Sequence, residues 1–158
     1  MLGTVSTEAK AEVARAAGAD AVILYAGRDF TPEVRRLTDG RGVDVVYDGV
    51  GRATFEAGLG CLAPRGTMVL YGQTSGPVGP LDLRSLTAHG SVVLTRPNLV
   101  HHVATRDALL ARAGEVLGWV STGRLALRMD FVFPLEAAAE AHQALEGRRT
   151  IGKVLLVP

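Results

Sequence analysis

Short apolar runs alternate with helix-forming segments along the first hundred positions of the chain. The runs are rich in Val, Ile and Leu, as is typical of strands that are buried on both faces. They lie at residues 2–5, 21–25, 43–48, 67–71 and 91–96. Capping residues, a proline at a first helical position and terminating glycines predict helices between them, at about residues 8–17, 31–40, 54–62 and 82–88. This alternation predicts a doubly wound α/β fold, with a parallel sheet covered by helices on both faces.

The last third of the chain has a different pattern. Its longest helix is predicted at residues 105–121 and ends at Gly123. Six apolar residues share one face of that helix: Leu109, Leu110, Ala113, Val116, Leu117 and Val120. The pattern ends with a strand at 127–133, a helix at 135–145 and a strand at 153–157. Earlier in the chain, residues 64–66 and 72–80 are expected to be loops. We therefore expect an α/β domain over residues 1–123 and a strand–helix–strand segment over residues 124–158.

Composition and charge exclude several classes of protein. The 158 residues are 47% hydrophobic and 21% charged, which is enough apolar material for a sizeable core. A formal net charge of +1 provides no basic surplus for nucleic acid, and no apolar run approaches the ~20 residues of a membrane helix. The single cysteine, Cys61, excludes a disulfide framework, and the adjacent His101 and His102 do not form a metal-ligand pattern. With no secretory signal pattern at the N-terminus, we expect a cytoplasmic protein that has no bound metal and no membrane segment.

Ligands of open α/β sheets bind at the carboxyl ends of the strands. This rule selects the residues that directly follow each predicted strand: 6–7, 25, 49–51, 71–75 and 96–99. Glycines among them allow a ligand to approach the backbone closely, although glycine also serves simply to end a strand in a tight turn. The dinucleotide fingerprint G-x-G-x-x-G is absent, because the turn Asp48-Gly49-Val50-Gly51 has the wrong spacing. Several such turns on one edge favour a shared ligand site.

The residues after the first strand bear on the choice of cofactor. An NAD-binding sheet presents Asp or Glu at the end of its second strand to hold the ribose hydroxyls. Here Ser6 and Thr7 follow the strand, with no acid before Glu8, and Lys10 lies one helical turn beyond Ser6. Lys10 could place an ammonium group near a 2′-phosphate at the helix N-terminus. The alternative is an exposed lysine on a helix surface.

Several segments, in order along the whole chain, carry a family resemblance. They are GTVST at 3–7 with Lys10, AAGAD at 16–20, GVDVVYDGVG at 42–51, PRGTMV at 64–69, YGQTSG at 71–76, LTRP at 94–97 and GKVLLVP at 152–158. With these segments the chain resembles the later part of an NADPH:quinone oxidoreductase. This family is the zeta-crystallin-like, zinc-free branch of the medium-chain dehydrogenases/reductases.

The resemblance implies hydride transfer from NADPH to a quinone or enone, without zinc, by a homodimer that pairs through the edge strand Val92–Thr95. It assigns no catalytic residue within the chain. It implies thirteen cofactor-binding residues in five groups. These are Ser6, Thr7 and Lys10 at the 2′-phosphate; Tyr25 beside the adenine ribose; Val50, Tyr71, Gly72, Gln73 and Thr74 along the adenosine and pyrophosphate; Pro97, Asn98 and Leu99 beside the nicotinamide; and Arg148, a basic residue that reaches the cofactor.

The resemblance also implies that residues 1–158 lack the catalytic domain and the first strand, glycine-rich turn and first helix of the coenzyme domain. Because that first strand is central in the order 3-2-1-4-5-6, its absence would leave a gap in the sheet. The final strand, residues 153–157, is one candidate to fill the gap. We expect the isolated chain to bind NADPH weakly or not at all. Two alternatives are a non-catalytic dimerisation or nucleotide-binding module and an enoyl reductase of the same superfamily.

Overall fold

The computed structural model describes residues 1–25, 28–147 and 149–158. The chain forms two compact units, residues 1–102 and residues 103–158, which are described separately below. The boundary that we predict near residue 123 separates the coenzyme-binding domain from the C-terminal segment. It is not a division into compact units, and it stays a prediction. In the described part of the chain, every helix is too short or too polar to cross a membrane.

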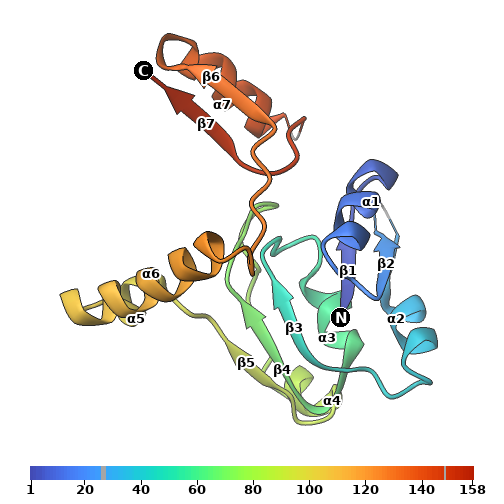
Figure 1. The fold of residues 1–158 in the computed structure, drawn as a ribbon. Helices are drawn as coiled ribbons and strands as arrows, with labels where there is room; N and C mark the ends of the chain where they lie inside the picture. Colours follow the sequence, from blue (N-terminus) through green and yellow to red (C-terminus); the bar gives the residue numbers. More distant parts are fainter. Residues whose placement is uncertain (26–27, 148) are drawn as a thin grey trace. The chain divides into compact units, whose positions relative to one another are not determined.

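The first unit is built from parallel strands and intervening helices, which confirms the α/β class (Figure 1). Its elements are β1 (Leu2–Val5), α1 (Glu8–Ala16), β2 (Ala21–Leu24), α2 (Thr31–Leu37), β3 (Val43–Asp48), α3 (Phe55–Cys61), β4 (Leu62–Leu70), α4 (Arg84–Ala88), β5 (Val93–Thr95) and α5 (Leu99–His102). All but α5 match elements predicted from the sequence. The short helix α5 was not predicted.

Local capping explains why the predicted helix boundaries are close to those observed. The Thr7 side chain accepts a hydrogen bond from the backbone N–H of Lys10 at 3.4 Å and so begins α1. The carboxylate of Asp29 accepts from the N–H of Thr31 at 2.9 Å, and Pro32 follows in the first turn of α2. Gly18, with φ of 98°, terminates the first helix as predicted.

β4 begins earlier than expected. Residues 64–66 were predicted to be a loop, but they belong to β4, which starts at Leu62, paired with Val43. The register between β3 and β4 shifts between Val43 and Val45, and Arg65 lies at a φ of 64°. This irregularity lets the strand pass through a Pro-Arg-Gly sequence that otherwise favours a turn.

The strands of the first unit form two separate sheets, so the gap expected from the missing central strand is neither closed nor filled by a described strand. β1 pairs with β2, and β4 lies between β3 and β5, with every pairing parallel. Within the described residues, β1 and β3 are not paired with each other, and Figure 1 shows the two groups of strands apart. The facing edges of β1 and β3 therefore keep unpaired backbone groups.

Helices α2 and α3 connect the two sheets through one apolar cluster. Ile23, Phe30, Val34 and Cys61 form its buried centre. Leu2 of β1 and Val43 and Val46 of β3 pack against this cluster. A second cluster centred on α3 and β4 comprises Phe55, Leu59, Leu62, Met68, Leu70 and Val92, with Leu86 of α4 packed against it. The first unit thus holds both sheets on a common core although they share no strand pairing.

Within the first unit, no described helix covers the other face of the β3–β4–β5 sheet. Strand register places Val45 beside Thr67 and Val93 on that face. Tyr47 is 73% exposed and Val93 is 54% exposed. The physical reason is that α3 and α4 both pack on the opposite face, in the cluster around Phe55 and Leu59.

Arg35 ties the end of α3 to the loop that follows α2. Its Nε and Nη2 atoms donate to the carbonyl of Gly60 at 3.1 and 2.7 Å, and Nη2 also donates to the carbonyl of Leu62 at 3.0 Å. Its Nη1 donates to the carbonyls of Gly40 and Arg41, each at 3.0 Å. One guanidinium therefore satisfies carbonyls from two segments about 20 residues apart.

The second unit contains α6 (Arg106–Ser121), β6 (Phe131–Pro134), η1 (Leu135–Ala137), α7 (Ala138–Glu146) and β7 (Val154–Val157). Thr105 begins α6 through its side chain, and Gly123, with φ of 71°, follows its end as predicted. β6 and β7 pair in parallel as a sheet of their own, so the prediction that residues 153–157 fill the gap beside β1 is wrong. The apolar face of α6 is present but largely uncovered, since Leu117 is 66% exposed.

Candidate functional site

The turn after β3 is organised by one buried carboxylate. Asp48 is 5% exposed, and its Oδ1 atom accepts from the N–H groups of Val50 at 2.7 Å and Gly51 at 3.0 Å. The buried hydroxyl of Thr54 donates to the same carboxylate at 3.0 Å. Because these donors come from the turn and from the residue that precedes α3, Asp48 holds the strand, the turn and the start of the helix together.

The loop after β4 is bound to this turn along its length. The N–H groups of Tyr71 and Gly72 donate to the carbonyl of Asp48 at 2.9 and 3.2 Å. Ser75 donates to the carbonyl of Val50 from its N–H at 2.8 Å and from its hydroxyl at 2.7 Å. The predicted site residues Val50 and 71–74 are thereby brought to one place.

Glycines in these two turns allow their backbones to touch. A Cβ atom on Gly72 would come within 2.8 Å of the Cα atom of Gly49. Gly51 has a φ of 85°, and a Cβ atom there would lie 2.8 Å from the carbonyl oxygen of Gly76. These contacts require glycine whether or not a ligand binds. The glycines thus serve the packing of one turn against the other, a role that the sequence pattern did not distinguish from ligand approach.

Arg96 links the end of β5 to the end of β4. Its Nη1 donates to the carbonyl of Leu70 at 3.0 Å, and the side-chain amide of Gln73 faces the same guanidinium, with its oxygen as the accepting atom. Pro97, Asn98 and Leu99 follow directly. The Asn98 side chain accepts from the N–H of Val100 at 3.1 Å and begins α5, in which Leu99 is the first residue and is exposed.

The predicted residues of the other sheet lie at the ends of β1 and β2. The N–H of Tyr25 donates to the carbonyl of Val5 at 3.0 Å, so Tyr25 lies beside the backbone that leads to Ser6 and Thr7. The hydroxyl of Thr7 is engaged in capping α1.

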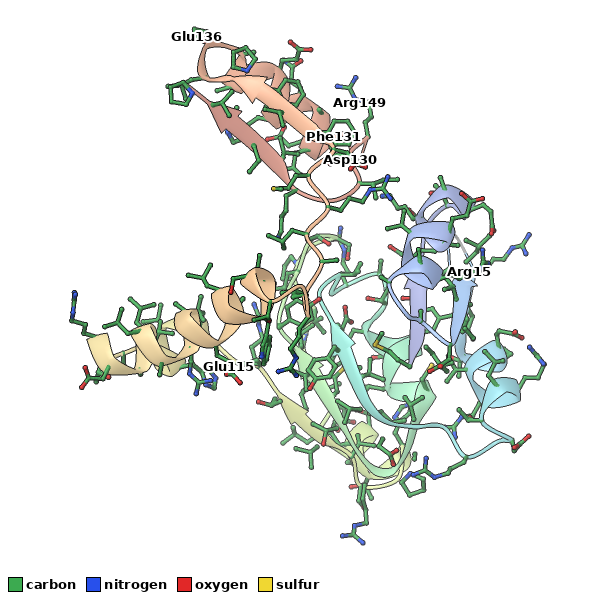
Figure 2. The ribbon with its side chains drawn as sticks, viewed as in Figure 1. Arg15, Glu115, Asp130, Phe131, Glu136 and Arg149 are labelled. Carbon is green, nitrogen blue, oxygen red and sulfur yellow. The ribbon has the colours of Figure 1, made fainter. Side chains whose placement is uncertain are left out.

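Lys10 is half-buried in the first turns of α1, and no ion pair among the described residues involves it. Glu8, two residues before Lys10, is instead paired with Arg15 at 2.7 Å; Arg15 is labelled on α1 in Figure 2. An unpaired ammonium group at this place remains available to an anion.

An open cleft of about 630 Å³ lies beside Tyr25, directly after β2. Its lining residues come from the segment after β2 and from the start of α3: Tyr25, Arg28, Asp29, Phe30, Thr31, Ala53, Glu56 and Ala57. The rings of Tyr25 and Phe30 meet edge to face, with their centroids 6.4 Å apart. Hydrogen bonds from Thr31 hold the pKa of Asp29 below its usual value.

Tyr25 and Ala53 both line the cleft. Tyr25 is bonded to the carbonyl of Val5, next to Ser6, and Ala53 is bonded through the hydroxyl of Ser75 to Val50. Arg148 lies outside the described residues.

The structure adds residues with no role assigned from the sequence: Asp48, Ser75, Arg96 and the cleft residues other than Tyr25. Their only sequence signal is that several directly follow strands.

Within the described residues no group of three or more His, Cys, Asp and Glu side chains is placed to hold a metal ion. His101 and His102 lie in α5. Burial raises the pKa of the Cys61 thiol, which favours its neutral form rather than a metal-binding thiolate. The donor set that a zinc site needs is therefore not found in the described part of the chain.

Comparisons with known proteins agree with this arrangement. Residues 17–156 match the family model described as zinc-binding dehydrogenase. Over the whole chain, the protein is 42% identical to a 2-haloacrylate reductase from a Burkholderia species and 41% identical to a quinone oxidoreductase from Pseudomonas aeruginosa. The chain covers 48% and 49% of these two proteins.

A solved structure of Escherichia coli quinone oxidoreductase complexed with NADPH is similar over 99% of this chain and 49% of its own, with 40% identity and a TM-score of 0.94. The chain thus spans about half the length of the curated relatives it matches. The family's description includes zinc, but the described residues do not fit a zinc ion, and we derive no step through a metal. By sequence match and by fold, the chain belongs to the zinc-binding dehydrogenase family.

Proposed function

We propose that this protein is part of an NADPH-dependent oxidoreductase and that residues 1–158 supply most of its coenzyme-binding surface. The observation that carries the proposal is the cleft lined by Tyr25, directly after β2, and by Ala53, in the segment after β3 that follows Val50. Both quinone oxidoreductase and 2-haloacrylate reductase are among its relatives.

The individual roles in this proposal follow the order of the strands along the chain. Lys10, with Ser6 and Thr7, would hold the 2′-phosphate of NADPH, because an ammonium group at a helix N-terminus favours an anion. Tyr25 would lie beside the adenine ribose, with Val50 and residues 71–74 along the adenosine and pyrophosphate. Pro97, Asn98 and Leu99 would lie beside the nicotinamide. Arg148 would provide a further cation.

Bound NADPH supplies a hydride, and the protein contributes position and electrostatics. A quinone and a 2-haloacrylate both contain a carbon–carbon double bond conjugated to a carbonyl group. We therefore propose an electron-poor alkene of this kind, a quinone or enone, as the acceptor. An acyl-thioester enone, as in an enoyl reductase, contains the same group and remains an alternative acceptor.

The open edges of β1 and β3 bear on how much of this activity residues 1–158 possess by themselves. A parallel strand between them would pair both edges and bring a further turn to the cofactor edge. Without it, we propose weak NADPH binding and negligible turnover for the isolated chain. The cofactor-binding half of the site would then need the remainder of the enzyme.

A homodimer through β5 is part of the proposal. Within the described residues, the sheet ends at β5, whose outer edge has no partner strand, and Val93 is exposed beside it. Pairing of two copies along this edge would satisfy its backbone groups. The same observation favours the second candidate function, a non-catalytic dimerisation module. A dimer that shows no response to NADPH would favour that second function. We place the protein in the cytoplasm, where its free thiol at Cys61 would stay reduced.

The test uses the only two lysines of the chain. We expect NADPH to shift the amide resonances of Ser6, Tyr25 and Val50 with a dissociation constant of about 1 mM or above. Lys10→Ala should weaken the binding of NADPH but leave that of NADH unchanged, since only NADPH has the 2′-phosphate. Lys153→Ala, in the second unit, is the matched control and should have no effect. Equal weakening for both nucleotides, or resonance shifts confined to residues outside the proposed site, would contradict the proposal.

A further inference from the structure

We propose that Ser75 is a positioning residue that sets Val50 in the conformation needed to contact the adenosine part of the cofactor. This inference rests on the proposed function and concerns the same edge of the sheet. Ser75 need not touch the cofactor in this role, because it acts through the peptide group that follows Val50.

The hydroxyl of Ser75 makes two hydrogen bonds at once. It donates to the carbonyl of Val50 at 2.7 Å and accepts from the N–H of Ala53 at 3.0 Å. The backbone N–H of Ser75 donates to the same Val50 carbonyl at 2.8 Å. The N–H of Arg52 donates to the carbonyl of Gly76 at 3.1 Å and adds a fourth bond between the two segments.

These bonds leave Val50 little freedom. Its N–H is held by the carboxylate of Asp48 at 2.7 Å, and its carbonyl is held by Ser75. A rotation of either peptide group would break at least one of these bonds. The Val50 side chain is therefore preorganised, and a ligand that contacts it does not have to order the turn.

Only a hydroxyl can fill this role at position 75. An alanine would lose the bond to the Val50 carbonyl and leave the N–H of Ala53, near the start of α3, without its protein acceptor. Threonine retains a hydroxyl in the same position. Cysteine has nearly the same shape, but its thiol is a weak donor and a weak acceptor.

The test measures binding of adenosine 2′,5′-bisphosphate, which contains the adenosine and 2′-phosphate parts of NADPH. We expect Ser75→Ala to raise its dissociation constant about tenfold, the effect of one lost hydrogen bond of ordinary strength. The backbone amides of Val50 and Ala53 should also exchange their hydrogens faster. Ser75→Thr should restore both properties, and Ser75→Cys carries the test if the alanine variant does not fold.

Ser121→Ala is the matched control. The hydroxyl of Ser121 also donates to a backbone carbonyl, that of Gly118 at 3.0 Å, but it lies in α6 of the second unit. Unchanged affinity in Ser75→Ala, or equal losses in Ser75→Ala and Ser75→Thr, would overturn the inference and leave the proposed function standing. Failure of the wild-type chain to bind the bisphosphate would instead overturn the proposed function, and this inference with it.

Discussion

Arg35 should contribute more to the stability of the first unit than any exposed ion pair. Its guanidinium makes five hydrogen bonds to four backbone carbonyls, which belong to the end of α3 and to the loop after α2. Removing it in Arg35→Ala leaves these carbonyls without their charged donor. It also loosens the contact between the two helices whose N-terminal ends border the cleft.

The magnitude follows from the burial of this side chain. A hydrogen bond to a charged group contributes about 1.5–3 kcal/mol when it is shielded from water. Arg35 is only half-buried, and the five bonds share one guanidinium, so their contributions do not add. We expect Arg35→Ala to lower the free energy of unfolding by about 2–4 kcal/mol. For a chain of this size, such a loss corresponds to a decrease in Tm of about 5–15 °C.

Thermal unfolding followed by circular dichroism measures this effect. Arg35→Lys should lose more than half of the stabilisation, because an ammonium group is a point charge that cannot span both segments. Arg36→Ala is the control. Arg36 is adjacent in sequence and pairs only with the exposed Glu33, at 2.7 Å, so its loss should leave Tm nearly unchanged. A Tm for Arg35→Ala within about 2 °C of wild type would refute the reasoning.

Two further predictions concern ionisable groups. The pKa of Asp29 is lowered by hydrogen bonds from Thr31, so its contribution to stability is present above the unfolded-state pKa of about 4 and is lost as pH falls through the lower folded-state pKa. The free energy of unfolding, measured with urea, should therefore decrease less for Asp29→Asn than for wild type as the pH is lowered from 5. Equal decreases in the two proteins would contradict this role of Asp29. Burial raises the pKa of the Cys61 thiol, so an aromatic disulfide reagent should react with it slowly at pH 8 in the native protein and rapidly in urea. Fast reaction of the native protein would show that Cys61 is not buried in solution.

The turns at the carboxyl edge of the three-stranded sheet are stabilised by contacts within one turn and between neighbouring turns. Asp48 organises the turn after β3, Ser75 joins it to the loop after β4, and Arg96 joins that loop to the end of β5. Each bridging group bonds to backbone atoms about 25 residues away in sequence. The edge of the three-stranded sheet therefore behaves as one preorganised surface, although it consists of three separate loops.

Hydrophobic pattern and capping residues predicted most of the elements because those signals are local. Thr7, Thr105 and Gly123 mark helix boundaries through bonds or dihedral angles within a few residues. The early start of β4 could not be predicted in this way. Leu62 joins the strand because Val43, 19 residues earlier, pairs with it.

The candidate site shows the same division. The rule that ligands bind after strands selected Val50, Tyr25 and residues 71–74, and the structure brings Val50 and residues 71–74 together while Tyr25 lines the cleft after β2. The same rule reached Ser75 and Arg96 without assigning them a role. Their importance depends on carbonyls that they meet only after the sheet has formed.

The sequence by itself determined the parallel α/β class and the order of its elements. Hydrophobic periodicity, helix-capping residues and glycines determine these properties, because each acts through interactions within a few residues of the chain. Only the tertiary structure decided that β7 pairs with β6 and that Arg35 and Ser75 hold distant segments together. Those outcomes depend on which backbone donors and acceptors come together in the folded chain. The sequence pattern does not show which distant residues will be hydrogen-bond partners.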